Sequence, residues 1–97
     1  MLTSITATVL WKKKIKEAHK KSSKHRDEVL KSESCGCFYC LSIFKPSEIS
    51  DWVDEDENGI GQTALCPKCG IDSVLGSNSG YPVTEIGFLK EMKSYWF

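Results

Sequence analysis

The fold of this chain is decided by Cys37-Phe38-Tyr39-Cys40 and Cys66-Pro67-Lys68-Cys69-Gly70, two cysteine pairs of identical spacing. Two intervening residues let the chain turn back, so that both sulfurs of a pair can reach a tetrahedral metal ion at roughly 2.3 Å. A second such turn completes a shell of four thiolates. The spacing therefore predicts one structural Zn²⁺ ion, with the ligands Cys37, Cys40, Cys66 and Cys69.

The second pair is the sharper signal for a zinc knuckle, a turn whose two cysteines chelate one zinc ion. Pro67 fixes φ after the first cysteine, and Gly70 can adopt the left-handed conformation that turns nearby amides toward the sulfurs. The alternatives are a redox dithiol and inert core cysteines. Two pairs, neither within a βαβ pattern, argue against the redox alternative.

The fifth cysteine, Cys35, is predicted to be a spare thiol. A single residue separates it from Cys37, which is too short a span for an unstrained chelate of the same kind. Four thiolates leave zinc no open position for water, so the predicted site is structural and has no catalytic residue.

The length of the chain and its number of cysteines favour a single domain over residues 1–97, with reduced cysteines and a metal ion that stabilises it. A chain of 97 residues buries a modest core, and zinc binding of about 10–16 kcal/mol in finger peptides rivals the stability of a whole domain. An odd number of cysteines argues against a secreted disulfide framework and favours the cytoplasm. The apolar stretch of residues 1–11 has its lysines behind it and is shorter than the roughly 20 residues that span a bilayer, so no membrane association is expected.

Charge is distributed unevenly, although the formal net charge is zero. Residues 12–31 contain nine Lys or Arg and three acids, whereas residues 48–57 contain six acids and no base. The basic segment could pack against its own acidic loop or meet an external polyanion, or both could simply be solvated faces.

The pattern along the chain predicts an α+β organisation around a zinc unit at residues 35–76. Residues 12–31 contain neither Gly nor Pro and repeat Ile15, Ala18, Ser22, His25 and Val29 at helical spacing, which predicts one basic amphipathic helix. Residues 1–11 could form an extended or mobile arm. The other expected elements are a helix from Pro46 to about Asp54, an exposed connection over 54–61, a strand over 63–65, a return strand or helical turn over 71–75, a loop over 76–82 and a C-terminal helix over 84–96 capped by Thr84.

An anion site on the basic helix is a second hypothesis. His19, Ser22, Ser23 and Arg26 would lie along one side of that helix and could bind a phosphate or carboxylate. The alternative is a polar face whose members bond to one another or to the acidic loop. His25 falls on the apolar stripe and is expected to be a packed core histidine.

Nucleic-acid binding has only a weak signal in the sequence. Phe38, Tyr39 or Trp52 could stack on bases while lysines neutralise phosphates. However, the lysines cluster on a segment separate from most aromatic residues, and Trp96 and Phe97 are expected to be buried in the core.

The longer motifs resemble a family of small bacterial proteins usually labelled "cytoplasmic protein". The resemblance rests on Cys35-Gly36-Cys37-Phe38-Tyr39-Cys40, on Phe44-x-Pro46-x-Glu48-Ile49-x-x-Trp52-x-Asp54 and on the run Thr63 to Gly76 with Cys66-Pro67-Lys68-Cys69-Gly70 at its centre. It implies bacterial origin, cytoplasmic residence and zinc binding, and adds no catalytic residue. A looser similarity is to treble-clef nucleases of the His-Asn-His type, but no histidine follows the first knuckle to supply their base and metal ligands.

Together these patterns predict a small α+β domain of zinc-ribbon or treble-clef type, with N-terminal and C-terminal helices packed on the zinc unit. Its function is expected to be that of a non-enzymatic binding module that engages a protein or nucleic acid through the basic helix. The alternative is a divergent nuclease-like enzyme that uses His19, Ser22 and Arg26 on a phosphorylated substrate. The expected core comprises Phe44, Ile49, Trp52, Leu65, Ile71, Val74, Phe88, Leu89 and Trp96.

Overall fold

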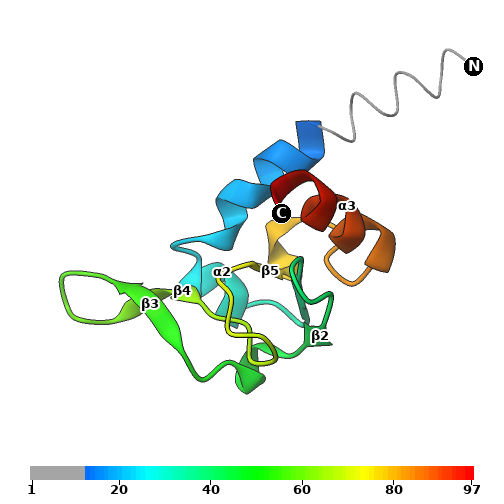
Figure 1. Ribbon diagram of the computed structural model, residues 1–97. Helices are drawn as coiled ribbons and strands as arrows, with labels where there is room; N and C mark the ends of the chain where they lie inside the picture. The colour runs from blue at the N-terminus through cyan, green and yellow to red at the C-terminus, as the bar shows by residue number, and fades with distance from the viewer. Residues whose placement is uncertain (1–12) are drawn as a thin grey trace, which may run out of the picture.

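The computed structural model describes residues 13–97, a small α+β domain with short helices at both ends and two small antiparallel sheets (Figure 1). The predicted arm of residues 1–11 lies outside this range. No helix of the described residues is long and apolar enough to cross a membrane. The elements are a helix at residues 13–19, η1 (Lys20–Ser22), α2 (Arg26–Leu30), β1 (Cys35–Cys37), β2 (Ile43–Phe44), η2 (Pro46–Glu48), β3 (Trp52–Glu55), β4 (Gly61–Ala64), β5 (Val74–Gly76), η3 (Ser77–Ser79) and α3 (Ile86–Trp96).

The predicted single helix over residues 12–31 is wrong, because the helix breaks between η1 and α2. Lys24 adopts a left-handed φ of 49°, and its N–H donates to Thr63 Oγ1 at 2.8 Å. The backbone N–H of His25 donates to the Gln62 carbonyl at 2.8 Å. Strand β4 thus supplies the hydrogen bonds that a continuous helix would otherwise have made within itself.

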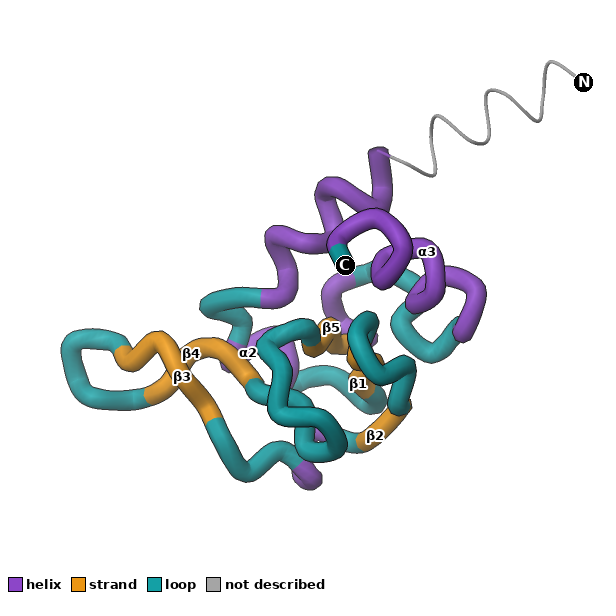
Figure 2. Tube along the Cα trace, in the orientation of Figure 1, coloured by secondary structure: helices purple, strands orange, loops and turns teal. Residues whose placement is uncertain are grey.

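A three-stranded antiparallel sheet in the order β2-β1-β5 carries both cysteine pairs (Figure 2). The first pair lies in the turn that joins β1 to β2, in which Cys35 is paired with Phe44. The second pair precedes β5, whose Val74 is paired with Cys37. The sheet register therefore brings two turns that are far apart in the sequence to the same end of the sheet.

The helix predicted from Pro46 to about Asp54 is also wrong beyond its first turn. It stops at Glu48 as η2, and Trp52–Glu55 form strand β3 instead. Trp52 is paired with Ala64 and Val53 with Thr63 in a β3–β4 hairpin that extends away from the remainder of the domain (Figure 1). Ladder pairing across this hairpin replaces the helical hydrogen bonds, while the predicted strand at residues 63–65 is confirmed at its first two positions.

The C-terminal helix α3 is confirmed, but it begins at Ile86 with Glu85 as its N-cap, not with Thr84. Glu85 makes no side-chain capping bond. Phe88, Leu89 and Met92 form its buried face. Ile86, Tyr95 and Trp96 are exposed, although Trp96 was expected in the core.

Two clusters of buried side chains hold these elements together. The first joins the N-terminal helix, the first cysteine turn, β5 and α3, and the second surrounds the cysteines and joins α2 to the sheets. Phe38 is 1% exposed and belongs to the first cluster, so this ring is not free to stack on a base. Of the predicted core, Phe44, Ile49, Val74, Phe88 and Leu89 are buried, Trp52, Leu65 and Ile71 are half-buried, and Trp96 is 37% exposed.

Candidate metal centre

Four cysteine side chains converge at the end of the three-stranded sheet. The sulfurs of Cys37, Cys40, Cys66 and Cys69 all lie within 4.8 Å of one another. Two contacts cross between the pairs, Cys37 Sγ to Cys69 Sγ and Cys40 Sγ to Cys66 Sγ, each at 3.7 Å. Sulfurs about 2.3 Å from a tetrahedral zinc would be about 3.8 Å apart, which these contacts match, whereas a disulfide needs about 2.05 Å.

The two cysteine turns are built in the same way. In the first, the Cys37 N–H donates to the Ser42 carbonyl at 3.0 Å and the Leu41 N–H donates to the Cys37 carbonyl at 2.9 Å. In the second, the Cys66 N–H donates to the Ile71 carbonyl and the Gly70 N–H to the Cys66 carbonyl, both at 2.9 Å. Each turn is therefore closed by its own backbone.

The left-handed residue expected in the second turn is present, and the first turn has a counterpart. Gly70 has φ of 79°, as predicted, and Leu41 has φ of 65° at the equivalent position. Leu41 was missed because a leucine in this conformation has no sequence signal comparable to that of glycine.

Backbone amides point at the first sulfur of each turn. The N–H groups of Tyr39 and Cys40 lie 3.4 and 3.5 Å from Cys37 Sγ, and the Lys68 N–H lies 3.4 Å from Cys66 Sγ. Such donors stabilise negative charge on sulfur. Both turns are therefore organised to hold thiolates.

The thiols of this cluster have unequal acidities. Burial acts to raise the pKa of Cys40, but hydrogen bonds from Ser42 and from the neighbouring thiols outweigh it and lower the pKa to about 7. Burial raises the pKa of Cys69 to about 12, and it also raises the pKa of Cys66. Four adjacent thiolates would repel one another, so a divalent metal ion bound at this cluster would supply the compensating charge.

The chemistry of the donor set fits zinc. Four sulfurs at tetrahedral spacing are typical of a closed structural Zn²⁺ site, in which the ion would join the two turns and leave no position for substrate. Cys37 Sγ also lies 3.1 Å from Ser73 Oγ, and Cys40 Sγ lies 3.1 Å from Ser42 Oγ, so two of the sulfurs have a hydroxyl neighbour that can orient them.

Cys35 lies outside the cluster. It is fully buried on β1 among the side chains of the second cluster, and this burial raises its pKa to about 12. Its sulfur is not among the four that lie within 4.8 Å of one another.

From the second cysteine turn, Cys66–Gly70, the chain continues to β5 without forming a helix. The fold and the site together define a small α+β domain with a four-cysteine cluster suited to zinc.

Comparison of the chain with protein families, with curated proteins and with solved structures found no match. The family resemblance drawn from the motifs has no support from these comparisons. The one part of the resemblance that the structure supports is the grouping of the paired cysteines into a candidate metal site.

The three residues of the predicted anion site, His19, Ser22 and Arg26, all have partners within the domain. The His19 ring packs on Trp96 with ring centroids 3.9 Å apart, and Ser22 Oγ donates to the His19 carbonyl at 2.6 Å. The Arg26 guanidinium donates to the Gly61 carbonyl at 2.9 Å and lies 4.6 Å from the centroid of the Trp52 ring. The break at Lys24 lies between Arg26 and the other two residues in the chain.

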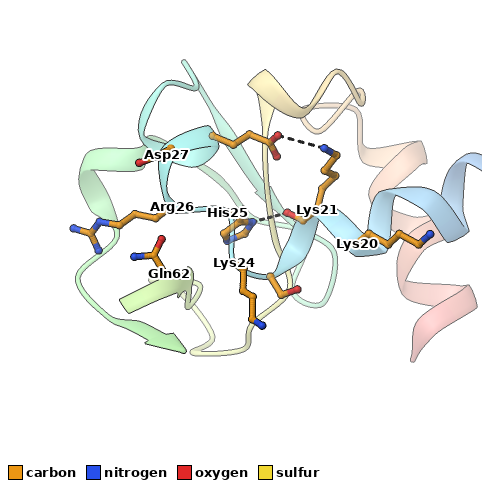
Figure 3. Close-up of a pocket in the computed structure, with 9 residues that line it drawn as sticks. Lys20, Lys21, Lys24, His25, Arg26, Asp27 and Gln62 are labelled. Atoms are coloured by element: carbon orange, nitrogen blue, oxygen red, sulfur yellow. Dashed lines mark hydrogen bonds and ion pairs between the residues drawn. The ribbon is translucent and has the colours of Figure 1, made fainter. Parts of the chain in front are cut away.

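The break itself creates a basic pocket of about 320 Å³ (Figure 3). We define the basic pocket by its lining residues, Lys20, Lys21, Ser23, Lys24, His25, Arg26, Asp27, Glu28 and Gln62. Sequence reasoning missed it, because a continuous helix has no such concavity. The signal that could have found it is the Ser22-Ser23 pair, since serine favours turns and caps over helix interiors.

His25 joins the basic pocket to the domain core. It is 6% exposed, and its Nε2 accepts a hydrogen bond from the Ala64 N–H at 3.1 Å, so its Nδ1–H donates to the Lys21 carbonyl. Burial lowers its pKa below the ordinary value, although Lys21 and Glu28 act in the opposite direction. The expected packed core histidine is confirmed, in the neutral form.

Proposed function

We propose that this protein is a zinc-stabilised, non-enzymatic binding module that engages a polyanionic partner, a nucleic acid or an acidic protein, through its basic pocket. Four thiols with the spacing of a closed zinc shell support a structural metal ion. Five free thiols favour a reducing compartment such as the cytoplasm. The observation that carries the binding function is the excess of cations in the basic pocket.

Four cations and two acids line the pocket. Lys21 pairs with Glu28 at 3.7 Å, and Arg26 is engaged by Gly61 and Trp52. Among the described residues, Lys20 and Lys24 form no ion pair and are exposed. These two ammonium groups are therefore available to an external anion.

The acidic segment of the chain does not neutralise this surface. Of the two ion pairs found in residues 13–97, one joins Lys21 to Glu28 and the other joins Lys68 to Glu48. Neither links the basic residues 13–31 to the acids of residues 48–57. The basic segment is therefore not paired with the acidic segment. This supports an external polyanion as its partner, the second of the alternatives given by the sequence.

Binding of labelled duplex DNA, single-stranded DNA and poly-glutamate to the zinc-loaded full chain tests this function. The variant Lys20→Glu/Lys24→Glu is compared with Lys31→Glu/Lys45→Glu, which changes the net charge equally at exposed positions outside the pocket. We expect the pocket variant to weaken binding of at least one polyanion by about tenfold and to reduce its salt dependence, because each phosphate contact adds about 0.9 to the slope for duplex DNA. Equal losses in both variants, or no binding at low salt by the unmodified chain, would contradict the proposal.

A further inference from the structure

The last turn of α3 places aromatic side chains on the surface. Tyr95 is 44% exposed, Trp96 37% and Phe97 61%, and Tyr39 from the first cysteine turn is 40% exposed. Large apolar rings that gather on the surface of a small domain mark an interaction site more often than rings that are scattered singly.

These rings form a continuous chain, which we call the aromatic array: Tyr95, Trp96, His19, Phe38, Phe97 and Tyr39. Successive ring centroids lie 4.9, 3.9, 6.0, 5.8 and 4.9 Å apart in that order. Phe38 is the buried member of the array, and its ring contacts those of His19 and Phe97. The rings come from the N-terminal helix, the first cysteine turn and α3, so only the folded, zinc-organised domain assembles them.

Each end of the aromatic array carries a lysine. Lys16 Nζ lies 6.0 Å from the centroid of the Tyr95 ring, and Lys93 Nζ lies 5.4 Å from that of Tyr39. Within the described residues neither lysine forms an ion pair. Residues 13–21 contain five lysines and one acid, so the surface that adjoins the array is basic.

The aromatic array is also continuous with the basic pocket. His19 belongs to the array, and the next residues in the chain, Lys20 and Lys21, line the pocket. The array and the basic pocket therefore meet at residues 19–21 of the chain. Lysines and aromatic residues that lie on separate segments of the sequence are therefore brought near one another by the fold.

We infer that the exposed rings of the aromatic array form a stacking platform for the bases of a single-stranded nucleic acid, whose phosphates are neutralised by the adjoining lysines. The inference rests on the proposed function and specifies its partner. Rings flanked by cations match a strand that offers flat bases and phosphates together. A duplex is a poorer fit, because its base faces are already stacked inside the helix. A purely apolar protein segment would not use the lysines at either end.

Trp96 is left unchanged in the test because its indole Nε1–H donates to the Ile15 carbonyl at 3.3 Å, which fixes the N-terminal helix on α3. Tyr39 lies between two of the cysteines and is also left unchanged. The informative variants are Tyr95→Ala/Phe97→Ala, which removes two exposed rings, and Tyr95→Leu/Phe97→Leu, which keeps apolar bulk without a planar face. The matched control is Leu30→Ala/Ile60→Ala, which removes two exposed apolar side chains elsewhere.

Fluorescence anisotropy of the zinc-loaded full chain with single-stranded oligothymidylate and with duplex DNA is the measurement. We expect both ring variants to weaken single-strand binding by about tenfold or more, with little change in duplex binding or in salt dependence. The control variant should bind as the unmodified chain does.

Four outcomes would overturn the inference. If Lys20→Glu/Lys24→Glu weakens single-strand binding while both ring variants bind normally, stacking is excluded and the proposed function stands. If only poly-glutamate binds, the nucleic-acid partner is excluded and the basic pocket keeps its proposed function. If sedimentation shows self-association that the ring variants abolish, the aromatic array is instead a contact between copies of the chain. Failure of every polyanion to bind would overturn the proposed function as well.

Discussion

At the scale of single residues, Cys35 and Cys37 show how position decides the role of a thiol. Both lie on β1 and are fully buried, yet only Cys37 belongs to the four-cysteine cluster. Cys35 is surrounded by apolar side chains that raise its pKa to about 12 and hold it as a neutral thiol.

Replacement of these two cysteines by alanine is therefore expected to have opposite effects on metal content. Cys35→Ala should keep one zinc per chain and cost about 1 kcal/mol of stability, since it removes one buried sulfur from a packed cluster. Cys37→Ala should abolish stoichiometric zinc, because three thiolates no longer close the shell. Elemental analysis of freshly purified protein measures both, and loss of zinc from the Cys35 variant would show that the ligand set is wrong.

His25 predicts a pH dependence of stability. Its folded-state pKa lies below the ordinary value of about 6.5, so in the window between these two values the unfolded chain binds a proton that the folded chain excludes. The free energy of unfolding should therefore rise with pH through this window and level off above about 6.5.

The control for this prediction is His25→Gln, which can still accept from the Ala64 N–H but does not titrate. Chemical denaturation of both proteins at several pH values gives the difference between them, in which the pH dependence of the zinc ligands cancels. A difference that does not change between pH 5.5 and pH 7.5 would rule out His25 as its source.

At the scale of elements, the junction between η1 and α2 depends on one side chain of β4. Thr63 is fully buried, and its Oγ1 accepts from the Lys24 N–H and donates to Asp54 Oδ2 at 2.7 Å. The same hydroxyl thus links the helix break to both strands of the hairpin.

Thr63→Val keeps the shape of this side chain and removes both hydrogen bonds. We expect a loss of about 1–3 kcal/mol in the free energy of unfolding, because the Lys24 N–H loses its acceptor in a partly buried position. Thr84→Val is the matched control, since Thr84 lies exposed in the turn before α3. Equal stability of the two variants, measured by chemical denaturation, would show that the junction does not need the hydroxyl.

The elements also show which parts of the fold are predictable from sequence. The two cysteine turns are predictable because their hydrogen bonds close within six residues, and Gly70 supplies the conformation that one of them needs. The breaks at Lys24 and after Glu48 are not, because β4 causes both through residues about 10 to 40 positions away in the chain.

The residues of the candidate sites were likewise predictable only in part from the sequence. The four ligand positions follow from spacing alone, whereas the basic pocket and the aromatic array depend on tertiary contacts. Trp96 and Phe97 were expected in the core because of their size, but α3 ends with these residues at its solvent-facing margin. Side-chain chemistry does not reveal on which side of a helix end a ring will lie.

At the scale of the whole molecule, the metal ion is expected to decide whether the domain folds. The second cluster of buried residues includes Cys35, Cys37 and Cys66, so the core surrounds the cysteine turns and does not stand apart from them. Loss of a bound ion would therefore remove a cross-link that lies inside this core.

Removal of zinc by a strong chelator should therefore unfold the domain cooperatively. We expect the circular dichroism of the strands and of α3 to be lost together, and to return when zinc is added, because metal binding and folding are coupled in small zinc domains. Calcium serves as the control ion, since thiolates bind it poorly. Unchanged circular dichroism after complete demetallation would contradict this prediction.

The self-closed cysteine turns have a consequence for the order of assembly. Each turn makes its own backbone hydrogen bonds, so Cys37 and Cys40 can capture an ion as a bidentate arm before the later part of the chain has collapsed onto the sheet. Cys66 and Cys69 would complete the set of four sulfurs when the later part of the chain packs on the sheet. The rate of zinc loading is accordingly expected to show one phase that depends on zinc concentration and a later phase, set by packing of the second turn, that does not.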